Sequence, residues 1–250
     1  MFDIYFFRMY KFRYHVIMEE TMIKTYDNIV QGTDEWFAVR CGVLTASEMY
    51  KIITPTLKIA DNEETKSHLF EILAQRISKY VEPSYISDDM LRGKDEEMLA
   101  RALYSEKYGE VTETGFITND KWGFTLGYSP DGIVGDEGLI ECKSRKQKYQ
   151  IETILCQGMP DNKRINCMLQ IQTGLLVSER KWCDFVSYHG GLPMMVYRVY
   201  PDTVIQEAII KAAESFENKI NDLQEKYNSI VCNESMFTPT ERVNLEEISV

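Results

Sequence analysis

An aspartate, a glutamate and a lysine in the second half of the chain have the types and spacing that metal-assisted chemistry needs. Glu141 and Lys143 are two residues apart in a predicted strand, so their side chains point to the same face. A predicted tight turn at 135–138 folds Asp131 back beside Glu141. The two carboxylates can then bind one hard cation, with the carbonyl of Cys142 as an extra ligand. Such a cation activates water and neutralises a phosphate, while Lys143 holds the attacking water or stabilises the transition state.

The same pattern also fits a solvated hairpin that carries a cross-strand salt bridge. Two features of the surroundings favour the chemical interpretation. Glu141 follows Leu139-Ile140, an apolar pair typical of a buried strand, where an unpaired charge is unfavourable. Basic side chains leave the strand together, as a surface that faces phosphate groups requires; they are Lys143, Arg145, Lys146 and Lys148.

A third carboxylate can come from a predicted helix near the middle of the chain. Asp95 and Glu96 are interpreted as acids that favour a helix N-terminus, whereas Glu97 lies one turn further in and is the better ligand candidate. Gln170 and Gln172 lie in an otherwise apolar helix. Their residue type favours hydrogen bonds to buried backbone groups; the alternative is that one amide contacts the nucleophilic water or a nucleic acid.

A second polar group precedes a predicted helix near the start of the patterned sequence. Thr45-Ala46-Ser47-Glu48 has the form of a capping box and predicts a helix to about Ile53. A helix N-terminus with two hydroxyls, from Thr45 and Ser47, and the guanidinium of Arg40 nearby suits a phosphate group. The alternative is an ordinary helix cap beside a surface arginine.

The net charge of −11 argues at first against a nucleic-acid partner, but the charge is uneven along the chain. Residues 140–181 hold eight Lys/Arg and four Asp/Glu, whereas residues 201–250 hold four and ten. A protein with this distribution can contact phosphates through one basic face while its outer helices stay acidic.

The cysteines and histidines do not form a metal motif. No two of the six cysteines form a C-x-x-C pair, and none of the three histidines has ligand spacing. Oxygen ligands favour Mg²⁺, with Mn²⁺ as the alternative. The chain has no apolar run near the ~20 residues of a membrane span and no signal-peptide pattern, so we expect an intracellular protein with reduced thiols and no membrane partner.

The periodicity of the apolar residues predicts helices, a sheet, a helix, a sheet and a helix, in that order. The predicted helices include one with Leu69, Leu73, Ile77 and Tyr80 on one face, 93–108 with Leu99, Ala102 and Leu103 inward, 168–177, and a long helix with Ile205, Ile209, Ala212, Phe216, Ile220, Leu223 and Tyr227 on one stripe. Antiparallel strands are predicted within 115–145, at 182–188 and at 194–200. We therefore expect a mixed α/β fold with a central sheet, closer to α+β than to a doubly wound sheet.

Three regions are expected along the chain. Residues 26–228 form one domain, because no internal repeat or low-complexity linker divides them. Residues 1–25 are interpreted as an N-terminal extension that is either disordered or not native, with a true start at Met18 or Met22 as an alternative. Residues 229–250 form an acidic C-terminal tail.

Taken together, these segments resemble the phage lambda exonuclease family, also called the YqaJ-type viral recombinase nucleases. The resemblance covers roughly residues 31–227 and keeps the order of the family's motifs. The matching pieces are Trp36-Phe37-Ala38-Val39-Arg40, Gly42-Val43-Leu44-Thr45-Ala46-Ser47-Glu48, Gly93-Lys94 with Glu97, Ser129-Pro130-Asp131-Gly132, Glu141-Cys142-Lys143 and Gln170-Ile171-Gln172.

The resemblance implies a restriction-endonuclease-like core and 5′-to-3′ digestion of one strand of linear duplex DNA for recombination. By position, the metal ligands would be Glu97, Asp131, Glu141 and the Cys142 carbonyl. Lys143 and Gln172 would join the two acidic catalytic residues. The 5′-phosphate and DNA would be held by Arg40, Thr45, Ser47 and Ser129. We expect two Mg²⁺ ions per site.

The same resemblance implies partners and a setting. It implies double-stranded DNA ends as substrate, a ring-shaped homotrimer and, in some members, a single-strand annealing protein. A viral origin would place the protein in the host cytoplasm or nucleus. The departures are the residues before Tyr26, the tail after Asn228 and the cysteine within the Glu-x-Lys motif; the first two concern ring assembly more than catalysis.

Rival functions stay open at this stage. One is another nuclease on the same core: a junction resolvase, a site-specific endonuclease or an iron–sulfur nuclease, although the scattered cysteines disfavour a cluster. The other is a non-catalytic DNA-binding scaffold, which has no need of Asp131, Glu141 and Lys143 together.

Overall fold

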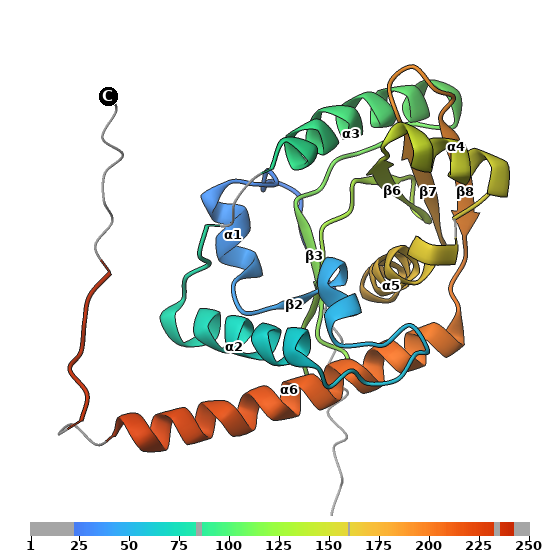
Figure 1. Ribbon diagram of the computed structural model, residues 1–250. Helices are drawn as coiled ribbons and strands as arrows, with labels where there is room; N and C mark the ends of the chain where they lie inside the picture. Colours follow the sequence, from blue (N-terminus) through green and yellow to red (C-terminus); the bar gives the residue numbers. More distant parts are fainter. Residues whose placement is uncertain (1–22, 84–86, 160, 233–235, 243–250) are drawn as a thin grey trace, which may run out of the picture.

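Two four-stranded sheets form the centre of the molecule, and helices pack around and between them (Figure 1). The computed structural model describes residues 23–83, 87–159, 161–232 and 236–242. The strands are β1 (Lys24–Tyr26), β2 (Leu44–Thr45), β3 (Phe116–Asn119), β4 (Leu126–Tyr128), β5 (Gly132–Val134), β6 (Gly138–Ser144), β7 (Trp182–Tyr188) and β8 (Met195–Val199). The helices are α1 (Asp34–Arg40), the 3₁₀ helix η1 (Ala46–Lys51), α2 (Glu63–Ser78), α3 (Asp88–Lys107), α4 (Gln147–Cys156), α5 (Asp161–Ser178) and α6 (Thr203–Val231).

Both sheets are mixed, which confirms the predicted fold class. The first has the order β1-β3-β4-β2 and the second β5-β6-β7-β8, with β2/β4 and β6/β7 as the parallel pairs. The prediction of one central sheet is wrong in this respect. The chain passes from β4 to β5 through Ser129-Pro130-Asp131, where proline supplies no N–H for a continued ladder.

The predicted hairpin is present and sets the register of the acidic residues. Strands β5 and β6 are antiparallel, with Gly132 paired to Ile140. Asp131 therefore comes just before the paired part of β5, opposite Glu141. Strands β7 and β8 also form, within the ranges expected from the sequence.

Helices cover the second sheet on both faces. Helix α3 packs on one face, where Ala100 and Tyr104 join Ile140 in a small apolar cluster. Helix α5 lies on the other face, and its apolar side belongs to the main core together with Leu139 and Phe185. Glu141 and Lys143 point to the same side as Leu139, so they lie on the face that α5 covers.

Helix α3 differs from its prediction in its start and in its orientation. It begins at Asp88 after the cap Ser87, five residues before the expected start, so Gly93 is inside the helix. Leu99 and Leu103, predicted to face inward, are 54% and 43% exposed, and Ala102 is also exposed. The inward stripe is instead made by small or polar residues spaced at three to four, including Glu97, Ala100 and Tyr104. Ala100 and Tyr104 pack against Ile140 and Val186 of the sheet, while the large aliphatic side chains of α3 lie outside.

The predicted capping box at Thr45 does not form. The segment after Thr45 is a short 3₁₀ helix, and the threonine side chain makes no capping bond to the backbone. Its hydroxyl instead donates to the carboxylate of Glu48 at 3.0 Å. The expected phosphate site therefore has no α-helix N-terminus, and the binding of an anion there would depend on side chains.

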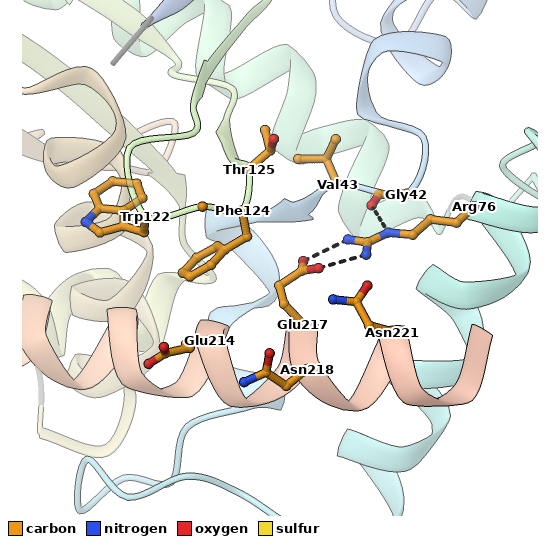
Figure 2. A pocket seen from close by; sticks show the side chains of 11 residues that line it. Gly42, Val43, Arg76, Trp122, Phe124, Thr125, Glu214, Glu217, Asn218 and Asn221 are labelled. Carbon is orange, nitrogen blue, oxygen red and sulfur yellow. Dashed lines mark hydrogen bonds and ion pairs between the residues drawn. The ribbon is translucent and has the colours of Figure 1, made fainter. Parts of the chain in front are cut away.

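A bidentate salt bridge connects helix α6 to α2. The guanidinium of Arg76 donates to both oxygens of Glu217 at 2.7 Å, and its Nε donates to the carbonyl of Gly42 (Figure 2). Beside this pair lies an open cavity of about 430 Å³ that Trp122 and Phe124 also line. Because Gly42 follows α1 closely, the pair also fixes the loop that leads from Arg40 to β2.

The ends of the folded part lie slightly outside the predicted limits. Strand β1 begins at Lys24 and pairs with β3, and α6 continues to Val231. Most of the proposed N-terminal extension and parts of the acidic tail lie outside the described residues. Among the described helices, none is both long and apolar enough to cross a membrane.

Candidate active site

Glu141 is completely buried, and donors from three elements surround its carboxylate. The hydroxyl of Tyr128, on β4, donates to Oε2 at 3.0 Å. The ammonium of Lys143, on β6, donates to Oε1 at 2.7 Å, and the amide of Gln170, on α5, donates to the same oxygen at 2.5 Å. Hydrogen bonds to the ionised form offset the loss of hydration that a buried carboxylate suffers.

Asp131 meets Glu141 across the hairpin, as its spacing predicts. Its Oδ2 accepts from the backbone N–H of Cys142 at 2.6 Å, which holds the aspartate against β6. Burial raises the pKa of Asp131 well above its usual range, and the nearby charges of Glu141 and Glu97 raise it further. The three acids therefore repel one another in the absence of a cation.

Glu97 reaches the same region from α3. Burial raises its pKa, Arg101 opposes this at an N–O distance of 3.4 Å, and Glu141 raises the pKa again. Arg101 also donates to the backbone carbonyl of Asp131 at 3.1 Å. The charge coupling links all three sequence-predicted carboxylates, although they come from three separate elements.

Lys143 is held between Glu141 and Gln170. Its ammonium donates to Gln170 at 3.0 Å as well as to the glutamate. Burial opposes its charge, but the attraction of Glu141 and Asp131 is larger, so the pKa of Lys143 is raised. The lysine is an ammonium donor at neutral pH and has no free electron pair to accept a proton.

The structure places Gln170 at the carboxylates and Gln172 elsewhere. The Gln172 amide donates to the carbonyl of Tyr200 at 2.8 Å and accepts from the N–H of Asp202 at 2.8 Å. Two residues apart on a helix are about 200° apart around its axis, so both amides cannot face the same cluster. The expectation for Gln172 is corrected: it anchors the chain between β8 and α6.

Tyr128 was not predicted from the sequence, and its only sequence signal lies on another element. Gly174 stands in the interior of α5, where glycine is unfavourable. A Cβ atom added at this glycine would lie 2.7 Å from the Tyr128 ring. The glycine thus marks the close approach of α5 to β4 that brings the tyrosine to Glu141.

The donor set fits a divalent cation. The charge of Glu141 raises the pKa of both Glu97 and Asp131, and hard oxygen ligands of this type favour Mg²⁺ or Mn²⁺. Burial raises the pKa of the Cys142 thiol, as do Asp131 and Glu97. The sulfur is therefore a neutral thiol, and the backbone carbonyl of Cys142 is the atom available as a ligand.

A second polar group surrounds Arg40. Its guanidinium donates to the Ser129 hydroxyl at 3.0 Å and approaches that of Thr45 at 3.4 Å. It lies 4.1 Å from the centre of the Trp36 ring. Ser47 lies at the exposed edge, its hydroxyl 3.4 Å from that of Thr45. The structure thus brings together all four residues that the sequence assigned to a phosphate.

The electrostatics around Arg40 suit an anion. Burial lowers the pKa of Arg40 to about 10, and the negative charge of Glu48 partly opposes the shift. The guanidinium still carries its charge at neutral pH. An anionic ligand would restore the interactions that the arginine loses on leaving water.

A third cluster, of Glu48, His68 and Glu71, contains groups that can bind metal. The Lys51 ammonium lies among them, at 3.1 Å from Glu48 and 3.5 Å from Glu71. A cation of the protein itself therefore already holds these carboxylates. Lys143 holds Glu141 in the same way, so an ammonium partner does not separate the two clusters. Asp131, Glu141 and Glu97 are kept as the metal candidate because the sequence motifs predict them.

Comparison with known proteins places this chain and its fold in a known class. The model of the YqaJ-like viral recombinase domain matches residues 35–181. An alkaline exonuclease from Laribacter hongkongensis, solved alone and in complex with dAMP, is 33% identical, with 79% of this chain covering 100% of that one at a TM-score of 0.66. A phage-related exonuclease from Haemophilus somnus 129PT shares the fold at 13% identity and a TM-score of 0.53, over 74% of this chain and 96% of that one.

The fold is therefore that of the restriction-endonuclease-like nucleases. The chain belongs to the YqaJ-like viral recombinase family, as its sequence motifs predict. A search of curated protein sequences gave no significant match.

Gly174→Ala should lower the free energy of unfolding by about 1–3 kcal/mol, because the added methyl group collides with the Tyr128 ring. Urea denaturation measures the change. Gly93→Ala is the matched control: it also lies inside a helix, its nearest neighbour would be 4.0 Å away, and it should gain up to about 1 kcal/mol. Equal gains at both positions would contradict the close packing at Tyr128.

Proposed function

We propose that the chain is a metal-dependent exonuclease that digests one strand of linear duplex DNA from its 5′ end and serves recombination. The observation that carries the proposal is the segment Ser129-Pro130-Asp131. Its serine contacts Arg40 in the anion pocket, and its aspartate faces Glu141 in the acidic cluster. Two residues of extended chain span only about 7 Å, so a bound end phosphate and a cleavage centre would be neighbours.

We expect two metal ions per site, Mg²⁺ or Mn²⁺. Their ligands would be Glu97, Asp131, Glu141 and the Cys142 carbonyl. Bound metal would supply an activated water and neutralise charge on the scissile phosphate. The 33%-identical alkaline exonuclease supports the reaction class, and its dAMP complex supports a mononucleotide as the released product.

The chain's own residues would then divide the remaining work. Tyr128 and Gln170 orient the Glu141 carboxylate through direct hydrogen bonds. Lys143 lies beside it as an ammonium and would donate to an oxygen on which negative charge develops. Since the ammonium carries no free electron pair, it orients and stabilises rather than accepting a proton.

The alternatives differ in substrate form. A junction resolvase or endonuclease on the same core would cut closed circles, and a non-catalytic scaffold would cut nothing. One gel separates them: linear and closed-circular duplex DNA, each with Mg²⁺ and with EDTA. The proposed exonuclease degrades the linear form alone and only with the metal.

Asp131→Asn, Glu141→Gln and Lys143→Ala should each remove most of the cleavage, with losses that do not add, because all act on one displacement. The two carboxylate variants should also weaken Mn²⁺ binding in a titration, whereas Lys143→Ala should not. Gln172→Ala, away from the cluster, should keep Mn²⁺ affinity. Near wild-type cleavage by Glu141→Gln would remove the site assignment.

Arg40→Ala should slow digestion of 5′-phosphorylated duplex by roughly ten- to a hundredfold, because charge-assisted phosphate contacts contribute ~1.5–3 kcal/mol each. Digestion of the 5′-hydroxyl duplex should change far less, so the preference for phosphorylated ends shrinks. Lys94→Ala, an exposed cation on α3, is the control that keeps the preference. Equal wild-type rates on the two ends would eliminate the pocket.

The assembly is proposed to be a closed homotrimer around DNA, with a single-strand annealing protein as a further partner. The support is the family resemblance and an apolar surface on α3, where Met98 and Leu99 are each 54% exposed. Light scattering at micromolar concentration should give about three times the 29.1 kDa of one chain. A monomer mass would end this claim and leave the nuclease proposal standing.

A further inference from the structure

Glu48 is a carboxylate beside the group of Arg40, Thr45 and Ser129 that is proposed to bind a phosphate. Its Oε2 accepts the proton of the Thr45 hydroxyl at 3.0 Å, and its Oε1 accepts from Lys51 at 3.1 Å. Thr45 is buried and its oxygen is also 3.4 Å from the Arg40 guanidinium. Glu48 thus lies one hydroxyl away from the arginine that would bind phosphate.

A hydroxyl has one proton to donate. As long as Thr45 gives it to Glu48, the threonine offers only lone pairs toward the pocket, and these suit Arg40 and not an anion. A phosphate that needs this hydroxyl as a donor must compete with the carboxylate. Glu48 therefore reduces the donors available to a bound phosphate while keeping Thr45 aligned with Arg40.

The net charge around Glu48 also weakens the binding of a phosphate at Arg40. Glu48 and Glu71 share the single ammonium of Lys51, and His68 lies 3.8 Å from Glu48. With a neutral imidazole, two carboxylates and one ammonium leave one excess negative charge. Glu48 is only 22% exposed, so water screens its charge incompletely, whereas the Glu71 side chain is 49% exposed.

We propose that Glu48 is a positioning residue that limits the affinity of the Arg40 pocket for a terminal 5′-phosphate, so that the nucleoside monophosphate leaves after each cleavage. The inference rests on the proposed function. In that reaction the phosphate held by the pocket departs with the product, and the next 5′ end must take its place. A pocket with every donor free would hold the product and slow the following cycle.

The test is titration of dAMP into the full-length protein in EDTA, followed by calorimetry, so that only the pocket is measured. Glu48→Gln should bind dAMP roughly tenfold more tightly than the wild type, because the charge repulsion is removed and the neutral amide oxygen competes less strongly for the Thr45 proton. A merely structural role predicts the opposite, since a disordered pocket binds less. With Mg²⁺ and DNA, the same variant should show stronger inhibition by dAMP.

Three further variants sharpen the result. Glu71→Gln removes the same charge from the Lys51 network without touching Thr45 and should bind dAMP within about twofold of the wild type. Thr45→Val should reduce the gain from Glu48→Gln, because the hydroxyl that would turn toward the phosphate is absent. Lys51→Gln removes the ammonium that neutralises part of the Glu48 charge, so it should weaken dAMP binding. This variant therefore tests the inference with the opposite change in affinity if Glu48→Gln does not fold.

The outcomes separate the inference from the function beneath it. Unchanged or weaker dAMP binding by folded Glu48→Gln, or unchanged binding by Lys51→Gln, overturns the role of Glu48 and leaves the exonuclease proposal intact. If dAMP binds Arg40→Ala as tightly as the wild type, the pocket itself is misassigned, and the inference falls with it.

Discussion

Glu141 is a fully buried carboxylate, and the need to keep its charge satisfied away from water constrains much of the structure. Its partners come from β4, β6 and α5, so a strand of each sheet and the helix between them must be correctly placed at once. Asp131 and Glu97 add like charges, which Lys143 and Arg101 offset only in part, since the pKa of each acid is still raised. The protein thus maintains a site in which removing one partner leaves a buried charge without compensation.

The crossing between the sheets explains why the polar group around Arg40 and the acidic residues are held by one segment. Within four residues, Tyr128 contacts Glu141, Ser129 contacts Arg40, and Asp131 contacts the backbone of β6. Pro130 ends one ladder and allows the next to begin. A change that shifts this segment would alter both groups together, so their relative position is a property of the fold and not of a mobile loop.

Features of the fold and the site that depend on residues close together in the sequence could be predicted, whereas those that depend on distant residues could not. The hairpin and the Glu141/Lys143 pair follow from strand periodicity and turn residues, and both are local patterns. Gln170 could not be separated from Gln172, because the face that α5 presents depends on distant strands. The orientation of α3 differs from its prediction for a similar reason: its large aliphatic residues favour one face, whereas the face that packs on β6 and β7 is set by distant strands and buries Ala100 and Tyr104. The division into two sheets depended on a proline whose effect appears only once the ladders are known.

The contact between Gly174 and Tyr128 also has an evolutionary consequence. The helix lies against the tyrosine ring with no space for even a methyl group. A lineage that acquired a side chain at position 174 would have to replace the tyrosine with a smaller residue in the same interval, and would lose a donor to the buried glutamate. Positions 128 and 174 should therefore vary together among descendants of this chain, even though neither carries a charge and 46 residues separate them in the sequence.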